Sequence, residues 1–187
     1  MQIQIISSNN YISQGLHFIR HKIRLPADER LKLLDIDLYP TEKLSTSGLT
    51  YKVILLVPFS LRDEEVVARH LNVAGIVNIN LKVHKILDQI NDITGRINAP
   101  GYGRDPLTKM QWEIGACLYS GLNYQLCSRI QGITKKSISR NKREAMVKLG
   151  LKVDYHFLML AGLKQRIELK RLSNFLLYQR LSITSEK

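Results

Sequence analysis

The sequence predicts an α/β N-terminal domain, a short parallel sheet flanked by helices, followed by an all-α helix-turn-helix domain with an extra C-terminal helix. Short apolar runs alternate with helical repeats through residues 1–96. Helical segments bounded by glycine follow one another through residues 107–150. Between the two patterns, Pro100, Gly101 and Gly103 punctuate the run INAPGYGRD. We therefore expect a linker at 97–105.

The N-terminal pattern predicts four strands and three helices, with the strands parallel because helices separate most of them. The helix near 12–23 also carries His17 and His21, four residues apart. With no third ligand in view, we expect solvated histidines and no metal site. The expected elements are strands at 1–6, 31–39, 51–57 and 74–79, and helices near 12–23, 62–71 and 83–93.

Residues 107–150 predict three short helices separated by tight turns. Thr108 is expected to cap the first, with Gln111 closing a capping box and Leu107 packing against Trp112. Asn123 is expected to cap the second. The helices are predicted at 109–119, 124–130 and 135–149, and their ends or turns at Gly121, Gly132 and Gly150.

The predicted helix at 135–149 separates an apolar face from a cationic face. At 100° per residue, Ile138, Ala145 and Leu149 fall on one side. Glu144 is the single acid of this helix, against six basic residues: Lys135, Lys136, Arg140, Lys142, Arg143 and Lys148. A cationic helix after a turn suits the major groove of DNA, where Arg or Lys reads guanine and neutralises phosphates. An ordinary solvated helix face is the alternative.

This stretch resembles the LuxR-type (NarL/FixJ-like) helix-turn-helix. The resemblance covers some 45 residues without a gap and rests on Leu107-Thr108, Glu113, Gly121, Ile133-Thr134-Lys135-Lys136-Ser137-Ile138 and Lys148-Leu149-Gly150. The sequence departs from the family pattern at Gln111, Leu126-Cys127-Ser128, Gln131 and Asn141. The resemblance implies a four-helix domain at 106–162, with 135–149 as recognition helix and a dimerisation helix near 154–161.

The same resemblance assigns roles within the recognition helix. It implies that Ser139, Arg140 and Arg143 face the bases. The DNA backbone contacts it implies are Lys136, Ser137 and Lys148, to which we add Lys135 and Lys142 from the flank of the cationic face.

The order of elements in residues 1–96 resembles the receiver domain of two-component response regulators. Gly15 and Ala74-Gly75 lie where receivers carry glycines. The interval between the first helix and Asp35 is too short for a full strand and helix, so one βα unit is expected to be reduced or lost. Asp35 or Asp37 would be the relic of the phosphoacceptor.

The residues that phosphorylation of a receiver needs are mostly replaced. Ser7 and Ser8 occupy the acidic positions that hold Mg²⁺. Val57-Pro58 takes the place of the hydroxyl residue and Ile79 that of the lysine, with Lys82 too far along. We therefore expect a degenerate receiver-like domain at 1–96 that does not take phosphate, with phosphorylation at Asp35 or Asp37 as the alternative.

Charge and composition agree with a nucleic-acid binder. Residues 1–96 hold 12 Lys and Arg against 10 Asp and Glu, whereas residues 97–187 hold 16 against 6. We find no signal peptide, membrane span, cofactor motif or enzyme site, and expect a cytoplasmic protein with no cofactor and no membrane contact. Cys117 and Cys127 are expected to be reduced, buried thiols.

The last segment, 163–187, is helix-prone and rich in basic residues. It either extends the fourth helix after Gly162 or folds back as a fifth. It either packs on its own domain or contacts a second subunit or RNA polymerase. The sequence as a whole predicts a transcription regulator that binds double-stranded DNA as a homodimer or heterodimer, independent of phosphorylation, and that acts as an auxiliary partner of another response regulator. The rival hypotheses are a phosphorylatable response regulator and a protein-interaction module that sequesters another regulator without binding DNA.

Overall fold

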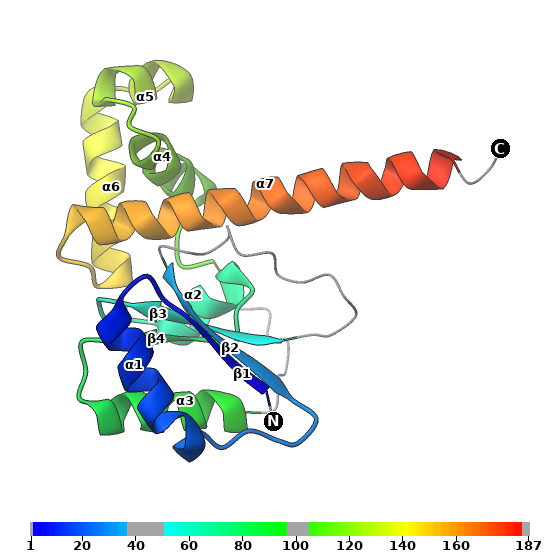
Figure 1. Ribbon diagram of the computed structural model, residues 1–187. Helices are drawn as coiled ribbons and strands as arrows, with labels where there is room; N and C mark the ends of the chain where they lie inside the picture. The colour runs from blue at the N-terminus through cyan, green and yellow to red at the C-terminus, as the bar shows by residue number, and fades with distance from the viewer. Residues whose placement is uncertain (1, 37–50, 97–104, 185–187) are drawn as a thin grey trace.

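The computed structural model describes residues 2–36, 51–96 and 105–184, with side chains described as far as residue 169. The linker expected at 97–105 lies, except for Asp105, outside the described residues, as does Asp37. Two parts follow one another along the chain: an α/β part and a helical part (Figure 1).

A four-stranded parallel sheet organises the α/β part. Its order is β1 (Gln2–Ile6), β2 (Arg30–Asp35), β3 (Lys52–Val57) and β4 (Gly75–Asn78). The register aligns apolar residues across the sheet, with Ile3 beside Leu31 and Leu33 beside Ile54. The parallel sheet expected from the sequence is therefore confirmed, as the central strands are buried on both faces.

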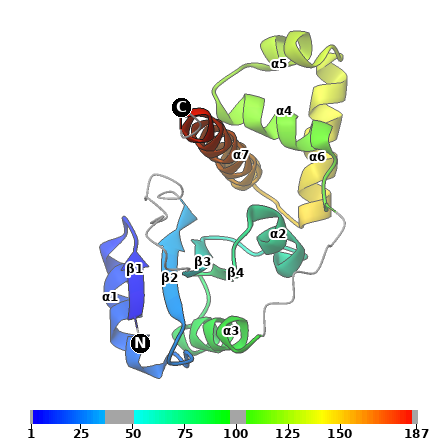
Figure 2. The ribbon, with the colours of Figure 1, turned by 90° about the vertical axis from the view of Figure 1, so that its right-hand side faces the viewer.

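Helices cover both faces of this sheet. One face packs against α1 (Asn10–Ile19) and α3 (Val83–Gly95), which bury their own apolar stripes there. The other face packs against α2 (Glu64–Leu71) and against the helical part of the chain (Figure 2). Between α1 and β2 the chain forms only the 3₁₀ turn Arg20–Lys22, so the βα unit expected to be lost is absent from residues 20–29.

The helical part consists of four helices. These are α4 (Lys109–Tyr119), α5 (Tyr124–Gln131), α6 (Lys135–Leu149) and α7 (Asp154–Thr184). The expected boundaries of the first three are reproduced to within one residue. No helix within the described residues is both long and apolar enough to cross a membrane.

Of the two alternatives for the C-terminal extension, the structure shows the first: it continues the expected fourth helix as one helix, α7. Gly162 lies inside α7, where a Cβ atom would come within 2.5 Å of the Tyr119 ring on α4. The glycine therefore allows α4 and α7 to approach closely and does not break the helix. Leu163 and Ile167 continue the buried side of α7 beyond it.

One hydrophobic cluster joins the two parts of the chain. It includes Val67 and Leu71 of α2 together with Leu149 of α6 and Phe157 and Leu160 of α7. The face of the sheet that packs against α2 is thus also covered by the helical part. The helical part therefore packs directly on the receiver-like part.

Candidate nucleic-acid interface

The three helices α4, α5 and α6 form a capped helix-turn-helix frame. Thr108 and Gln111 make both hydrogen bonds of the capping box at the start of α4. The Asn123 carboxamide oxygen accepts hydrogen bonds from two amides of α5, and the Thr134 hydroxyl accepts one from Ser137 at the start of α6. Gly132, with φ of 64°, makes the turn between α5 and α6. The predicted caps at Thr108 and Asn123 are confirmed.

A small core fixes the orientation of α6. Ile114 of α4, Cys127 of α5 and Ile138 of α6 are buried together, one from each helix. Ala145 and Leu149 of α6 are buried in the larger cluster. The apolar face expected from helical spacing is therefore the inner face of α6, and the opposite face is turned to solvent.

The structure places the predicted base-contacting residues on the outer face of α6. Arg140 and Arg143 are exposed, and Ser139, which precedes Arg140, is half-buried. The Arg140 guanidinium bonds to Glu144 one turn later, at 2.7 Å. That hydrogen bond lowers the pKa of the Glu144 carboxyl. Arg143 bonds only to the backbone carbonyl of Ser139 among the contacts described, at 3.4 Å.

The predicted backbone-contacting residues lie at the two ends of this face. Lys135 and Lys136 are exposed in the first turn of α6, beside the half-buried Ser137. Lys148 is exposed in the last turn, and its amine is 3.1 Å from the Gln111 side-chain oxygen. Basic side chains at both ends of a groove-binding helix suit the two phosphate backbones that flank the groove.

Lys142 is the exception among the predicted contacts. Its side chain is 12% exposed, its amine forms an ion pair with Asp154 of α7, and it lies 5.7 Å above the Tyr124 ring. Burial lowers the pKa of the Lys142 amine, but the hydrogen bonds to Asp154 and Tyr124 outweigh it and raise the pKa. The structure thus places Lys142 between α5, α6 and α7, away from Arg140 and Arg143.

One residue of the outer face was not singled out from the sequence. Val147 is 65% exposed, and it lines an open depression with Arg140, Arg143, Glu144 and Lys148. The sequence could have indicated its place on this face, because Val147 follows Arg140 by seven residues and residues seven apart lie on the same face of a helix. An apolar side chain among cations is suited to contact the methyl group of thymine.

The receiver-like part docks at the far end of α6 and leaves the outer face open. The amide of Arg62 donates a hydrogen bond to the carbonyl of Leu149, the last residue of α6, at 2.9 Å. Beside it, the rings of Phe59 and His156 stack at 4.4 Å between centroids. In Figure 1 α6 lies at the edge of the helical part, and the exposure of Arg140, Arg143 and Val147 shows that its outer face is open to solvent.

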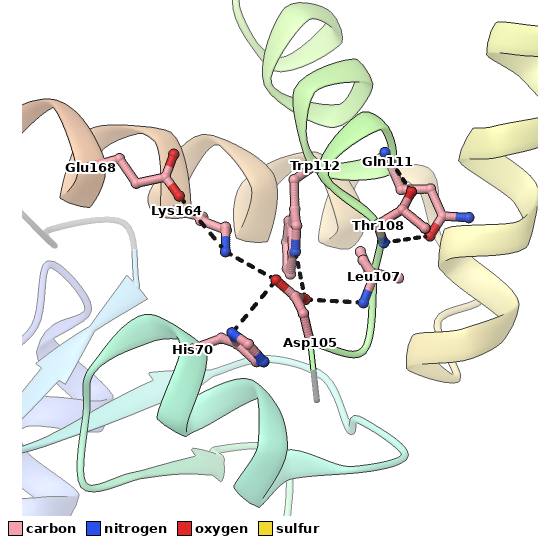
Figure 3. Close-up of polar contacts among 8 residues, drawn as sticks. All are labelled: His70, Asp105, Leu107, Thr108, Gln111, Trp112, Lys164 and Glu168. Carbon is pink, nitrogen blue, oxygen red and sulfur yellow. Dashed lines mark hydrogen bonds and ion pairs between the residues drawn. The ribbon is translucent and has the colours of Figure 1, made fainter. Parts of the chain in front are cut away.

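Asp105 joins the two parts at a polar junction (Figure 3). Its carboxylate accepts hydrogen bonds from the Trp112 indole at 2.9 Å and the Leu107 amide at 3.0 Å. It also faces Lys164 of α7 at 3.4 Å and His70 of α2 at 3.5 Å. Burial by itself would raise the pKa of Asp105, but these bonds and charges outweigh it and lower the pKa.

At the edge of the sheet that would hold phosphate in a receiver, neutral side chains surround Asp35. The Ser7 hydroxyl donates to the buried Asp35 carboxylate at 3.0 Å. At the neighbouring strands, the Asn78 amide donates to the Ser60 hydroxyl at 2.8 Å, a pair the sequence reasoning missed. Within the described residues, no group of three His, Cys, Asp or Glu side chains could hold a metal ion.

These features define a class of chain: a shortened receiver-like α/β part fused to a helix-turn-helix part with an exposed cationic helix. No family model matches the sequence, and no curated protein does. Among solved structures, full-length FixJ from B. japonicum has 11% identity and a TM-score of 0.32, with 88% of this chain and 97% of that chain covered.

Two further matches are RcsB from Salmonella enterica serovar Typhimurium, bound to the promoters rprA and P1flhDC in the presence of phosphomimetic BeF₃⁻. Their identities are 17% and 18% and their TM-scores 0.37 and 0.35; each match covers 87% of this chain and 98% of that chain. Matches at these identities and TM-scores assign no function to this chain.

Proposed function

We propose that this chain is a sequence-specific DNA-binding transcription regulator without enzymatic activity. The observation that carries the proposal is the outer face of α6, where Arg140 and Arg143 are exposed on a helix whose inner face is fixed by a buried core. A rigid helix with exposed guanidinium groups can enter the major groove and bond to guanine edges. The placement of the receiver-like part at the far end of α6 supports this proposal, since it leaves that face accessible.

The DNA contact that we propose for each side chain follows from its position on α6. Arg140, Arg143 and Ser139 contact bases, and Val147 adds an apolar contact beside them. The side chains assigned to phosphates are Lys135, Lys136, Ser137 and Lys148. Lys142 belongs to the phosphate contacts only if its ion pair with Asp154 opens on binding.

We further propose that the protein binds double-stranded DNA as a dimer, either with a second copy or with another regulator to which it is an auxiliary partner. Two α6 helices one helical turn of DNA apart would read two half-sites. Tyr155 and Leu169 of α7 are exposed apolar side chains, and they support a role for this helix in subunit or RNA polymerase contact.

We propose that DNA binding is independent of phosphorylation. Ser7 bonds to Asp35 at the place where a receiver would need an acidic side chain for Mg²⁺, and a neutral hydroxyl is a weak ligand for that ion. The alternative, a response regulator phosphorylated at Asp35 or Asp37, predicts that acetyl phosphate with Mg²⁺ adds one phosphoryl group. We expect intact-mass measurement to show no such addition, and a phosphorylated species would favour the alternative.

Selection of binding sites from random duplexes with the full-length protein tests the main proposal. The best site is then titrated over a salt series with the wild type, with Arg140→Ala/Arg143→Ala, and with Lys82→Ala/Lys85→Ala as control. The control removes the same charge from exposed positions at the start of α3. We expect the α6 variant to lose discrimination between sites by about 1–3 kcal/mol per arginine and the control to retain it.

Two outcomes would count against the proposal. Equal behaviour of the α6 variant and the control would remove Arg140 and Arg143 from the base-reading face. Absence of DNA binding by the protein, both alone and together with a co-purified cellular regulator, would favour the rival protein-interaction module. A dimeric regulator additionally predicts two half-sites about one helical turn apart and a steep decrease of affinity with salt.

A further inference from the structure

The core of the helix-turn-helix places the two cysteines of the chain side by side. The sequence contains two cysteines, Cys117 on α4 and Cys127 on α5, and both are free thiols. They pack in the same cluster as Ile114 and Ile138. Cys117 packs against the buried group of side chains that includes Cys127. The two cysteines therefore share one small core although they belong to different helices.

The turn between α4 and α5 holds this arrangement. The Leu122 amide donates a hydrogen bond to the Cys117 carbonyl at 3.2 Å, and the Cys127 thiol donates to the Leu122 carbonyl at 3.6 Å. Leu122 is thus bonded to both cysteines, and the chain closes a small loop on itself. A disulfide needs an S–S bond of about 2 Å, so the two side chains have to meet within the core that they share.

The two thiols differ in their access to solvent. Cys117 is half-buried and lines a cavity of about 610 Å³ between α4 and α7, where the Gln131 amide donates to its sulfur at 3.8 Å. Cys127 is fully buried, and this burial raises the pKa of its thiol. A small oxidant in the cavity therefore meets Cys117 first, with Cys127 behind it.

We propose that Cys117 and Cys127 form a reversible intramolecular disulfide when the protein meets hydrogen peroxide. The Cys117 thiolate attacks one oxygen of the peroxide, the O–O bond breaks, and sulfenic acid forms at Cys117 with release of hydroxide. The Cys127 sulfur then attacks the Cys117 sulfur, the S–O bond breaks, and hydroxide leaves. With the two thiol protons, the products are one disulfide and two molecules of water, and a dithiol reverses the bond.

The bond has a structural consequence at the proposed DNA-binding helix. Formation of the S–S bond would draw Cys127 toward α4 and away from Ile138 of α6, with which it is packed. The position of α6 relative to α4 and α5 would therefore change. Resting on the proposed function, we expect the oxidised protein to bind its selected DNA site more weakly than the reduced protein.

Intact-mass analysis of the reduced full-length protein after one equivalent of hydrogen peroxide tests the chemistry. We expect a loss of about 2 Da, two thiols that no longer react with iodoacetamide, single-chain mobility on a non-reducing gel, and full reversal by dithiothreitol. Because these two are the cysteines of the sequence, an intrachain disulfide can have only this pairing. Cys117→Ser should abolish the bridge, and Cys127→Ala should leave a sulfenic acid that dimedone traps at Cys117.

Mass gain by added oxygen without a bridge in the wild type would overturn the proposal, as would disulfides formed only between chains. Cys117 is only half-buried, so we expect Cys117→Ser to fold. This variant keeps the test valid even if Cys127→Ala does not fold. DNA titration of both redox forms is a separate readout. Unchanged affinity would overturn the effect on α6, whereas failure of both forms to bind DNA would count against the proposed function and leave the mass result standing.

Discussion

The amide of Arg62 donates a hydrogen bond to the carbonyl of Leu149 at 2.9 Å, and this bond joins the receiver-like part to the last residue of α6. Gly150 follows in the left-handed conformation, with φ of 72°. Leu149 is buried in the cluster that also holds Val67 and Leu71 of α2. The candidate recognition helix is therefore anchored at its C-terminal end on the receiver-like part.

Gly150→Ala tests this anchor. A Cβ atom at position 150 would lie 3.2 Å from the Cβ of Arg62 and 3.4 Å from its backbone nitrogen. The variant would also have to hold alanine in the left-handed conformation, at a cost of about 1–2 kcal/mol. We expect the free energy of unfolding, measured in urea, to decrease by more than this conformational cost alone.

Gly121→Ala is the matched control for that measurement. Gly121 has φ of 81°, and a Cβ atom there would meet nothing within 4 Å. It therefore bears the conformational cost without the contact to Arg62. Equal destabilisation of the two variants would show that Arg62 can move away from the added Cβ atom at no measurable cost in stability.

Gly115→Ala tests the close packing of α4 on α7. An added Cβ atom would overlap Ala161 and lie 2.8 Å from the Phe157 ring. Because both neighbours are buried, we expect a loss of about 1–3 kcal/mol in the free energy of unfolding. Gly95→Ala, where a Cβ atom would meet open space at the end of α3, should leave stability unchanged or slightly raised. A stable Gly115→Ala variant would contradict the close approach of the two helices.

Asp105→Asn tests the charge at the polar junction. Asparagine keeps an oxygen for the Trp112 indole and the Leu107 amide but loses the charge that faces Lys164 and His70. Since the carboxylate is partly exposed, we expect a loss of less than about 1 kcal/mol near neutral pH. Trp112 is the single tryptophan of the chain, so its fluorescence reports unfolding at this junction.

The effect of Asp105→Asn should depend on pH with a definite sign. The pKa of Asp105 in the folded protein lies below its ordinary value of 3.8, so the carboxylate stabilises the folded state. This contribution is complete above the ordinary value and is lost as the pH falls through the folded pKa. We expect the difference between wild type and variant to be greatest near neutral pH and to shrink in acid. A difference that grows as the pH falls would refute the assigned direction.

Lys142→Ala separates stability from DNA binding. Because the Lys142 amine is paired with Asp154 and lies over Tyr124, we expect the variant to lose about 1 kcal/mol of stability. We also expect the slope of log affinity against log salt to stay close to that of the wild type. A slope reduced by about one unit would show that Lys142 contacts a phosphate.

The parts of the fold that depend on neighbours in the chain were predictable. The start of α4 followed from Thr108 and the end of α6 from Gly150, because a cap acts through residues three or four positions away. The buried face of α6 followed from helical spacing at Ile138 and Ala145. The loss of one βα unit followed from the short interval before β2.

The parts that depend on distant residues were not predictable in this way. Spacing placed Lys142 at the flank of the cationic face, yet Asp154 of α7 pairs with it across the turn. Helix propensity left open whether Gly162 ends a helix. In the structure Gly162 lies inside α7, where it packs against the Tyr119 ring of α4. The pairing of Ser60 with Asn78 joins the loop after β3 to the end of β4 and leaves no local pattern in the sequence.

The sequence by itself determined the order of elements, the capped helix-turn-helix and the charge of α6, since each arises from residues within a few positions of one another. Only the tertiary structure decided how α6 is held. It buries Leu149 against the receiver-like part and packs Cys117 and Cys127 into one core. It also pairs Lys142 with Asp154 while Arg140 and Arg143 stay exposed. The physical reason is that burial and ion pairing depend on which distant surfaces meet, and helical spacing alone does not specify that.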